Sequence, residues 1–386
     1  MVNMQSAENA LKSFYLDAIK DTLDMKTSPL LAKIEHTTDN VYGKDVKKLV
    51  RVGFNGGVAV GTETGNLPAS DPSNYVQLTA TLKNIYGTIE ISDKALRAAQ
   101  SNEGAFVNLL NDEMKYLLDG AKYNLHRMIM GDGKGTLCKF VAANGNVVRT
   151  CSHYKLVAGM KVVLVDEDGD YLENGLERKL LSVDRYGLAA TLDGPAIDTS
   201  IKEGFLSIVH YDEELTGIEA IFNNESIYGL TEEEYDLMKP IEYDLDDSFN
   251  ETLALQMIDE IEQRSNSAPN LIVCSFGVRR SLIQYYKEKG IVLPTTEIEG
   301  GFTAITFNGI PVVVDRFCDK GMMYFLNTND FKLCQLCDWQ WMENEDGKIL
   351  HQVPGKPVYT ATLVKYAELI CERPSAQGRI IGIFEE

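Results

Sequence analysis

The feature that most limits how this chain can fold is a long, glycine-rich segment with strand character between residues 44 and 91. Its apolar residues recur at every second position: Leu49, Val52, Val58, Val60, Val76, Leu78, Ala80 and Leu82. The pattern predicts a β-hairpin with arms of roughly twenty residues, about 60 Å long at about 3.3 Å per residue. A two-stranded ribbon of that length has no core of its own. We therefore expect it to lie on something else, and favour another subunit.

Composition and charge exclude several classes of protein. The chain has 386 residues, 44% of them hydrophobic, and a formal net charge of −20 at pH 7. It is therefore globular, with room for two or three domains, and too acidic for a general nucleic-acid binder. No signal peptide or membrane-spanning stretch is visible. The seven cysteines are odd in number and scattered, which indicates reduced thiols and a cytoplasm-like compartment.

Apolar periodicity predicts several helices before residue 137. An apolar stripe over residues 7–24 predicts one helix. Ser92 or Asp93 is placed to cap a short helix that runs to residue 100. A helix of about 28 residues follows, because apolar residues step by four and three from residue 106 to residue 128. The glycine-rich residues 131–133 end it.

Residues 137–211 predict a separate small all-β module. Short apolar strands over 162–165, 179–183, 188–192 and 205–209 are separated by turns, and their spacing suits a barrel of five or six strands. The chain then returns to mixed structure over 212–248, where the acidic run 232–234 is expected at a helix start.

An α/β unit is expected over residues 249–330. It holds amphipathic helices over 249–264 and 278–289 and strands over 271–274, 304–307, 311–314 and 322–326. Two long alternating strands, 331–343 and 359–372, follow, joined by a turn at 345–347.

One segment has the pattern of a catalytic loop. Cys274, Gly277, Arg280 and Ser281 match the C-x-x-G-x-x-R-S loop of protein tyrosine phosphatases, between a predicted strand and a predicted helix. There a helix N-terminus would activate the thiol while the arginine binds phosphate. However, Val273 stands where that family has histidine, and no general-acid loop is found. We favour a buried structural cysteine and keep the cysteine-dependent phosphatase as the alternative.

Other motifs have simpler explanations. Cys334 and Cys337 have redox or zinc spacing, but residues three apart on a strand point to opposite faces. Residues 131–136 miss the P-loop spacing, and the acidic run 166–170 is too compact for an EF-hand. The histidines are dispersed: His36, His126, His153, His210 and His351. We therefore predict no catalytic, cofactor-binding or metal-binding residues.

The order of these elements resembles the major capsid proteins of tailed phages with the HK97-like fold. Residues 83–93 resemble the end of that family's extended loop, and residues 102–106 the start of its spine helix. Residues 215–222, 277–280 and 300–302 are similar to segments of capsid proteins from phages of Gram-positive hosts. The resemblance covers nearly the whole chain except 137–211, which we interpret as an inserted barrel facing outward.

The resemblance implies an α+β fold divided into an N-terminal arm (1–43), an extended loop (44–91), a spine helix (92–136), the barrel (137–211), a peripheral connection (212–248), an axial domain (249–330) and long strands (331–386). It implies a non-enzymatic shell protein that is assembled in the host cytoplasm as hexamers and pentamers and encloses double-stranded DNA in the virion. Portal and decoration proteins are expected partners. The arm begins within about ten residues of Met1, which favours a separate scaffolding protein. An encapsulin-type nanocompartment is the alternative within the fold.

Overall fold

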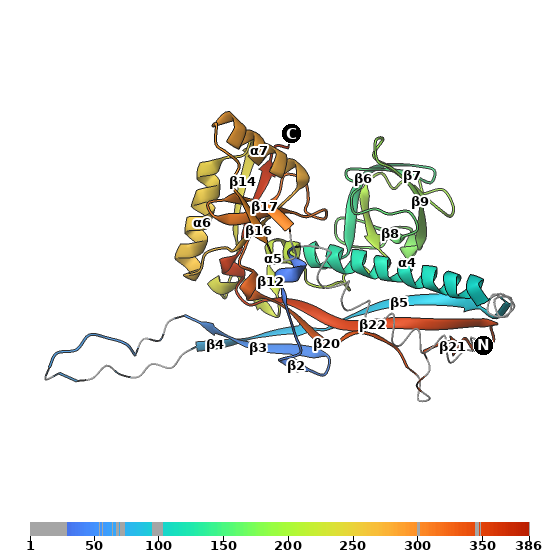
Figure 1. The fold of residues 1–386 in the computed structure, drawn as a ribbon, viewed down its shortest axis with the longest axis horizontal. Helices are drawn as coiled ribbons and strands as arrows, with labels where there is room; N and C mark the ends of the chain where they lie inside the picture. The colour runs from blue at the N-terminus through green and yellow to red at the C-terminus, as the bar shows by residue number, and fades with distance from the viewer. Residues whose placement is uncertain are drawn as a thin grey trace.

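The computed structural model describes residues 29–94 except 54, 56, 64, 67, 68 and 70–73, and then 103–298, 302–343, 347 and 349–385. The helix expected over 7–24 and most of the short helix after Ser92 lie outside these residues. In the described part, the chain forms a long sheet with a helix on it, a projecting hairpin, a barrel and an α/β unit (Figure 1). Each of the last two has its own apolar cluster, and a third, larger cluster lies along the long sheet.

The long sheet is built around one central strand. Strand β22 (Val358–Cys371) pairs antiparallel with β20 (Phe331–Trp341) on one edge and with β5 (Lys83–Ser92) on the other. The short strands β1 (Glu35–Thr37) and β21 (His351–Gln352) complete it. Along the chain, β21 follows β20 and precedes β22, and it pairs with β22. Most of the turn expected at 345–347 lies outside the described residues.

The predicted long helix lies along this sheet (Figure 1). Helix α4 (Glu103–Met130) has 28 residues, as the apolar spacing predicted, and its apolar side chains Met114 and Leu125 are buried. It approaches β5 closely at Gly87, where an added Cβ would lie 2.8 Å from Cδ1 of Leu117. A glycine here leaves room for the Leu117 side chain, which a larger residue would displace.

The projecting hairpin is shorter than predicted. Only β3 (Asp45–Val52) and β4 (Asn74–Thr81) pair, over eight residues each, with β2 (Val41–Tyr42) beside them. The prediction of twenty-residue arms reaching residue 91 was wrong, because the chain leaves the hairpin after Thr81 and joins the long sheet as β5. Alternation identified both strands but contains no information about their partners.

Residues after α4 form a closed six-stranded barrel, as predicted. Its strand order is β10-β7-β6-β11-β8-β9. The strands are β6 (Thr136–Asn144), β7 (Val147–Thr150), β8 (Lys161–Val165), β9 (Arg178–Asp184), β10 (Ala189–Leu192) and β11 (Gly204–Ile208), with the 3-10 helix η3 (Leu172–Gly175) between β8 and β9. Ser207 pairs with Thr136, so the chain enters and leaves the barrel at one place.

The connection back to the core is mostly short elements. Helix α5 (Ile218–Asn223) and strands β12 (Ser226–Ile227) and β13 (Leu230–Thr231) precede the 3-10 helix η4 (Asp236–Met238). The acidic run at residues 232–234 lies in a turn before η4. The expectation of a helix start there was therefore wrong; Glu233 and Glu234 are exposed, and Glu232 is partly buried.

The α/β unit is a seven-stranded sheet in the order β14-β23-β19-β15-β18-β17-β16. Its strands are β14 (Ile241–Asp247), β15 (Leu271–Cys274), β16 (Thr295–Ile298), β17 (Phe302–Phe307), β18 (Ile310–Val314), β19 (Met323–Leu326) and β23 (Gly378–Ile383). The sheet includes strands from outside the expected range 249–330, because β14 and β23 also belong to it. Three 3-10 helices lie at other turns: η2 (Leu31–Lys33), η5 (Thr328–Asp330) and η6 (Pro374–Ala376).

Helices α6 (Glu251–Ser265) and α7 (Phe276–Glu288) cover one face of this sheet. Side chains alternate along β15, so that Ile272 and Cys274 face these helices while Leu271 and Val273 face the larger core. Each helix begins where its sequence places a cap: Asn250 accepts a hydrogen bond from the Leu253 N–H, and Ser275 accepts one from the Val278 N–H.

Candidate functional site

The hairpin is the first candidate site, because it projects while exposing apolar side chains. Its base is buried: Val46 and Leu78 are each 1% exposed. Lys48 there forms an ion pair with Glu372, next to β22. Further out, Leu49 is 67% exposed and Tyr75 61% exposed. They lie on the same face of the ribbon, since Leu49 pairs with Gln77 and Arg51 pairs with Tyr75.

The apolar surface continues into the loop beyond the paired strands. Val58 is 81% exposed and Val60 is fully exposed. Both residues lie between β3 and β4, the hairpin that extends away from the body of the molecule (Figure 1). Isolated exposed apolar residues need no explanation, but four on one thin ribbon form a surface that favours contact with another molecule.

The loop at Cys274 does not have the environment of a catalytic thiol. Cys274 is fully buried, and its Sγ lies 3.7 Å from the carbonyl oxygen of Val313. Burial raises the pKa of the thiol to about 12, with Arg279 acting weakly in the opposite direction. A phosphatase needs the reverse, a thiolate at neutral pH.

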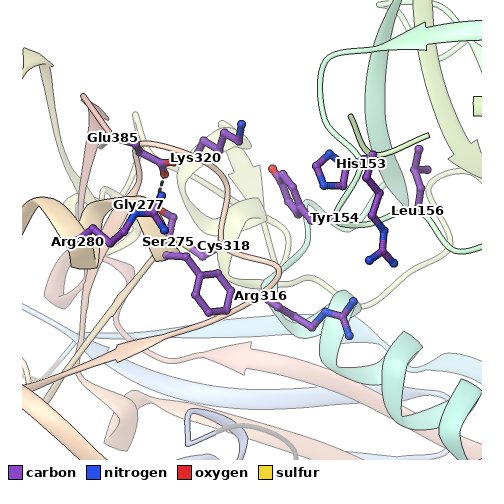
Figure 2. Close-up of a pocket in the computed structure, with 12 residues that line it drawn as sticks. His153, Tyr154, Leu156, Ser275, Gly277, Arg280, Arg316, Cys318, Lys320 and Glu385 are labelled. Carbon is purple, nitrogen blue, oxygen red and sulfur yellow. Dashed lines mark hydrogen bonds between the residues drawn. The ribbon is translucent and has the colours of Figure 1, made fainter. Parts of the chain in front are cut away.

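The helix N-terminus that would cradle phosphate is already occupied. A carboxylate oxygen of Glu385 accepts a hydrogen bond from the Ser275 hydroxyl (Figure 2). The same oxygen accepts a second one, at 2.8 Å, from the Gly321 N–H. An added Cβ at Gly277 would collide with the same carboxylate. Arg280 is exposed and lines the adjoining cleft. The structure therefore separates the two residues, with Cys274 in the core and Arg280 at the cleft, and leaves no room at the helix terminus for a phosphoryl group.

The remaining sequence motifs have structural roles. Cys334 is buried, whereas Cys337 is partly exposed. After α4, Asp132 accepts hydrogen bonds from the N–H groups of Lys134 and Gly135, which makes this a helix-ending turn. Asp166 does the same for Asp168 and Asp170. Among the described residues, no group of three His, Cys, Asp or Glu side chains could hold a metal ion.

Two buried ionic groups at the base of the barrel were not foreseen from sequence. Arg127, in the last turn of α4, makes a two-pronged ion pair with Glu214, just after the barrel, and both side chains are 3% exposed. The partners are 87 residues apart, a separation that no local spacing rule detects.

The second group lies between the barrel, α5 and the α/β unit, which is called the axial unit from here on. Lys155 Nζ lies 3.0 Å from Asp319 and 3.7 Å from Glu219, and Tyr154 donates a hydrogen bond of 2.5 Å to Asp319. Burial disfavours the charge on Lys155, but the two carboxylates outweigh it and raise the pKa of the lysine. Burial also raises the pKa of Glu219 to about 7. The cluster therefore ties the barrel to the rest of the chain.

No family model matches the chain, and no curated protein matches it in sequence. Solved structures do match. The capsid asymmetric unit of cyanophage A-1(L) has a TM-score of 0.58 at 10% identity, over 92% of each chain. The holo-SrpI encapsulin complex from Synechococcus elongatus has a TM-score of 0.46 at 8% identity, over 93% of this chain and 89% of that one. A virus-like particle from Pyrococcus furiosus has a TM-score of 0.44 at 10% identity, over 97% and 99%.

The overlap with the cyanophage capsid covers almost the whole of both chains. The protein therefore has the α+β HK97-like capsid fold, which phage major capsid proteins and encapsulins share, and carries a small closed β-barrel within it. The fold class predicted from sequence is confirmed. No helix in the described part of the chain is long and apolar enough to cross a membrane.

Proposed function

We propose that this chain is a phage major capsid protein, a non-enzymatic subunit that assembles as hexamers and pentamers into an icosahedral shell around double-stranded DNA. The observation that carries the proposal is the hairpin β3–β4, whose base is anchored in the subunit while its outer part exposes Leu49, Tyr75, Val58 and Val60. The HK97-like fold supports the same function.

The energetics of the hairpin favour an intermolecular role. Each of these apolar side chains gains about 1.5–3 kcal/mol when it is fully buried, and nothing in the described part of the subunit covers them. A neighbouring copy would supply the missing surface. One hairpin per subunit, repeated around a closed shell, gives every copy the same donor and acceptor surfaces.

The net charge of −20 acts against assembly. Subunits that repel one another stay dispersed until enough hairpin contacts form together. Salt screens this repulsion, with a Debye length of about 8 Å at physiological ionic strength. We therefore expect shells to form more readily in moderate salt than in low salt.

The further parts of the proposal concern location and partners. The mature protein would reside in the virion after assembly in the host cytoplasm, with a separate scaffolding protein, a portal and a decoration protein as partners. DNA would be enclosed without sequence-specific contacts. The barrel would face outward. The host would be Gram-positive, because residues 215–222 and 277–280 are similar in sequence to segments of capsid proteins from phages of such hosts.

Electron microscopy of the purified protein tests the proposal. The wild type should form closed shells, and replacement of residues 53–72 by a short Gly/Ser turn should leave capsomers or monomers. A finer variant is Leu49→Ser with Tyr75→Ser, which should also impair shells. Its matched control is Leu181→Ser with Tyr186→Ser, because these barrel residues are likewise exposed, at 55% and 102%.

Two outcomes would contradict the proposal. Normal shells from the deletion would show that the hairpin does not hold subunits together. Shells isolated from the natural source that protect no DNA from nuclease would favour the encapsulin-type compartment over the phage capsid.

A further inference from the structure

A cleft of about 510 Å³ lies between the barrel and the axial unit. One wall is the barrel loop that carries Tyr154 and Leu156, and the other is the start of α7, with Ser275 and Gly277 (Figure 2). Phe276 lines the cleft as well. Its size falls within the range of about 300–1,000 Å³ typical of ligand pockets. The function proposed above assigns no role to this cleft.

The cleft concentrates positive charge in a strongly acidic protein. Four exposed cationic side chains line it, one from the barrel and three from the axial unit: Arg185, Arg280, Arg316 and Lys320. Among the described residues, Glu385 is the single carboxylate that lines it. A chain of net charge −20 has no general excess of cations, so this cluster is a local departure from the composition.

One of these cations is held in place in advance. The guanidinium of Arg316 lies 5.1 Å from the ring centroid of Tyr123 and 5.2 Å from that of Phe317. Stacking of this kind restricts the side chain, so less entropy is lost when it binds a carboxylate with two parallel hydrogen bonds.

The chain itself shows which chemistry this place accepts. Glu385, two residues after the end of β23, inserts its carboxylate between Ser275 and Gly321 at the N-terminus of α7. It follows Phe384, which is 55% exposed. A carboxylate of the chain thus already contacts one end of the cleft, while Phe384 is not among the lining residues.

The walls favour a peptide over a nucleic-acid backbone. Phe276, which is 47% exposed, supplies most of the accessible apolar surface, and Leu156 and Cys318, at 3% and 5% exposed, lie behind it in the lining. Apolar walls suit a hydrophobic side chain, whereas phosphate contacts are made by polar and cationic groups on an open surface.

We propose that this cleft is a docking site for a short acidic peptide of a partner protein, with carboxylates bound by Arg316, Lys320 and Arg185 and an aromatic side chain placed against Phe276. Because the walls come from two units, the bound segment also bridges the barrel and the axial unit. The partner is defined by this chemistry: a segment that combines several Glu or Asp residues with an aromatic residue.

Fluorescence anisotropy tests the proposal. The probe is a fluorescein-labelled hexapeptide of four glutamates and two phenylalanines, added to the full-length protein at low salt. Arg316→Glu and Lys320→Glu should each weaken binding about tenfold, since each replaces a charge-assisted contact by a repulsive one. Lys320 is exposed, so its substitution keeps the test valid if the Arg316 variant folds poorly.

Matched controls separate a site from general charge attraction. Lys202→Glu makes the same change at an exposed lysine that does not line the cleft, and it should leave binding unchanged. The probe with glutamine in place of glutamate should not bind. Glu385→Gln should strengthen binding several-fold, because it removes the competing carboxylate.

Any of three results would overturn the proposal. The first is that the wild type does not bind the probe, and the second is that Lys202→Glu weakens binding as much as the cleft variants do. The third is that a short DNA duplex displaces the peptide and itself binds more weakly to the Arg316 and Lys320 variants, which would make the cleft a phosphate site.

Discussion

The buried pair of Arg127 and Glu214 allows a quantitative test of how the barrel is attached. Replacing Glu214 by leucine leaves a guanidinium that is 3% exposed without its carboxylate. Removing one partner of such a pair costs about 3–5 kcal/mol, because the remaining charge stays buried and uncompensated. We expect Glu214→Leu to lower the free energy of unfolding by that amount, and Arg127→Met to have an effect of the same order.

The double variant separates the interaction from the packing. Arg127→Met with Glu214→Leu removes both charges and keeps similar volumes, so we expect it to be within about 1 kcal/mol of the wild type. The coupling energy of the cycle would then be several kcal/mol, far above the usual additivity error of about 0.3–0.5 kcal/mol. A double variant as unstable as the worse single variant would refute the reasoning.

Urea unfolding followed by tryptophan fluorescence is a suitable assay. The two tryptophans of the chain, Trp339 and Trp341, lie in β20 and belong to the same core cluster as Met130 and Leu215, which flank the ion pair. The signal therefore reports on the unit that contains the pair. Equal denaturant slopes for all four proteins would show that the midpoints can be compared directly. A loss below about 1 kcal/mol in both single variants would also contradict the prediction.

Three further predictions follow from other buried groups. Burial raises the pKa of Glu368 to about 7, so the folded protein binds its proton more tightly than the unfolded chain does. Stability should fall as pH rises from about 4.5 to 7, and Glu368→Gln should reduce this fall in urea titrations at several pH values. Iodoacetamide at pH 7.5 should modify the exposed Cys151 before the buried Cys274, as mass spectrometry of peptides would show, and Cys274→Ser should retain assembly without aryl phosphatase activity in either protein. A variant with 137–211 replaced by a Gly/Ser linker should fold. Adding Glu219→Gln should stabilise this variant, because the deletion removes Lys155, the cation that pairs with Glu219. In wild-type shells, a barrel that resists proteolysis would contradict its outward placement.

Local periodicity was enough to predict the elements that depend on nearby residues. The spacing of Met114, Leu117, Leu125 and their neighbours specified α4 to its full length, because a helix that packs on a sheet needs one continuous apolar stripe. Short strands separated by turns specified the barrel in the same way. Cap residues such as Ser275 also act over one turn and were therefore close to the predicted boundaries.

Features made by distant residues could not be predicted in this way. Strand β5 has the alternation of a hairpin arm, but it pairs with β22, more than two hundred and fifty residues later. Glu385 meets Ser275 across 110 residues, and Arg127 meets Glu214 across 87. The cleft needs the barrel and the axial unit to be placed side by side, which no single segment encodes. Partner choice, rather than element type, was the information missing from one sequence.

The central position of β22 has a mechanical consequence. Ten residues of this strand are in register with β5, and eight residues of β20 pair with its other edge. A force that pulls along the strand axis loads these ladder hydrogen bonds together, in shear, whereas a force that peels one strand from its end breaks them in turn. The long sheet is therefore stiffest along its own length. A subunit stretched in that direction should yield first at its loops and at the junctions between units, while the long sheet keeps its shape.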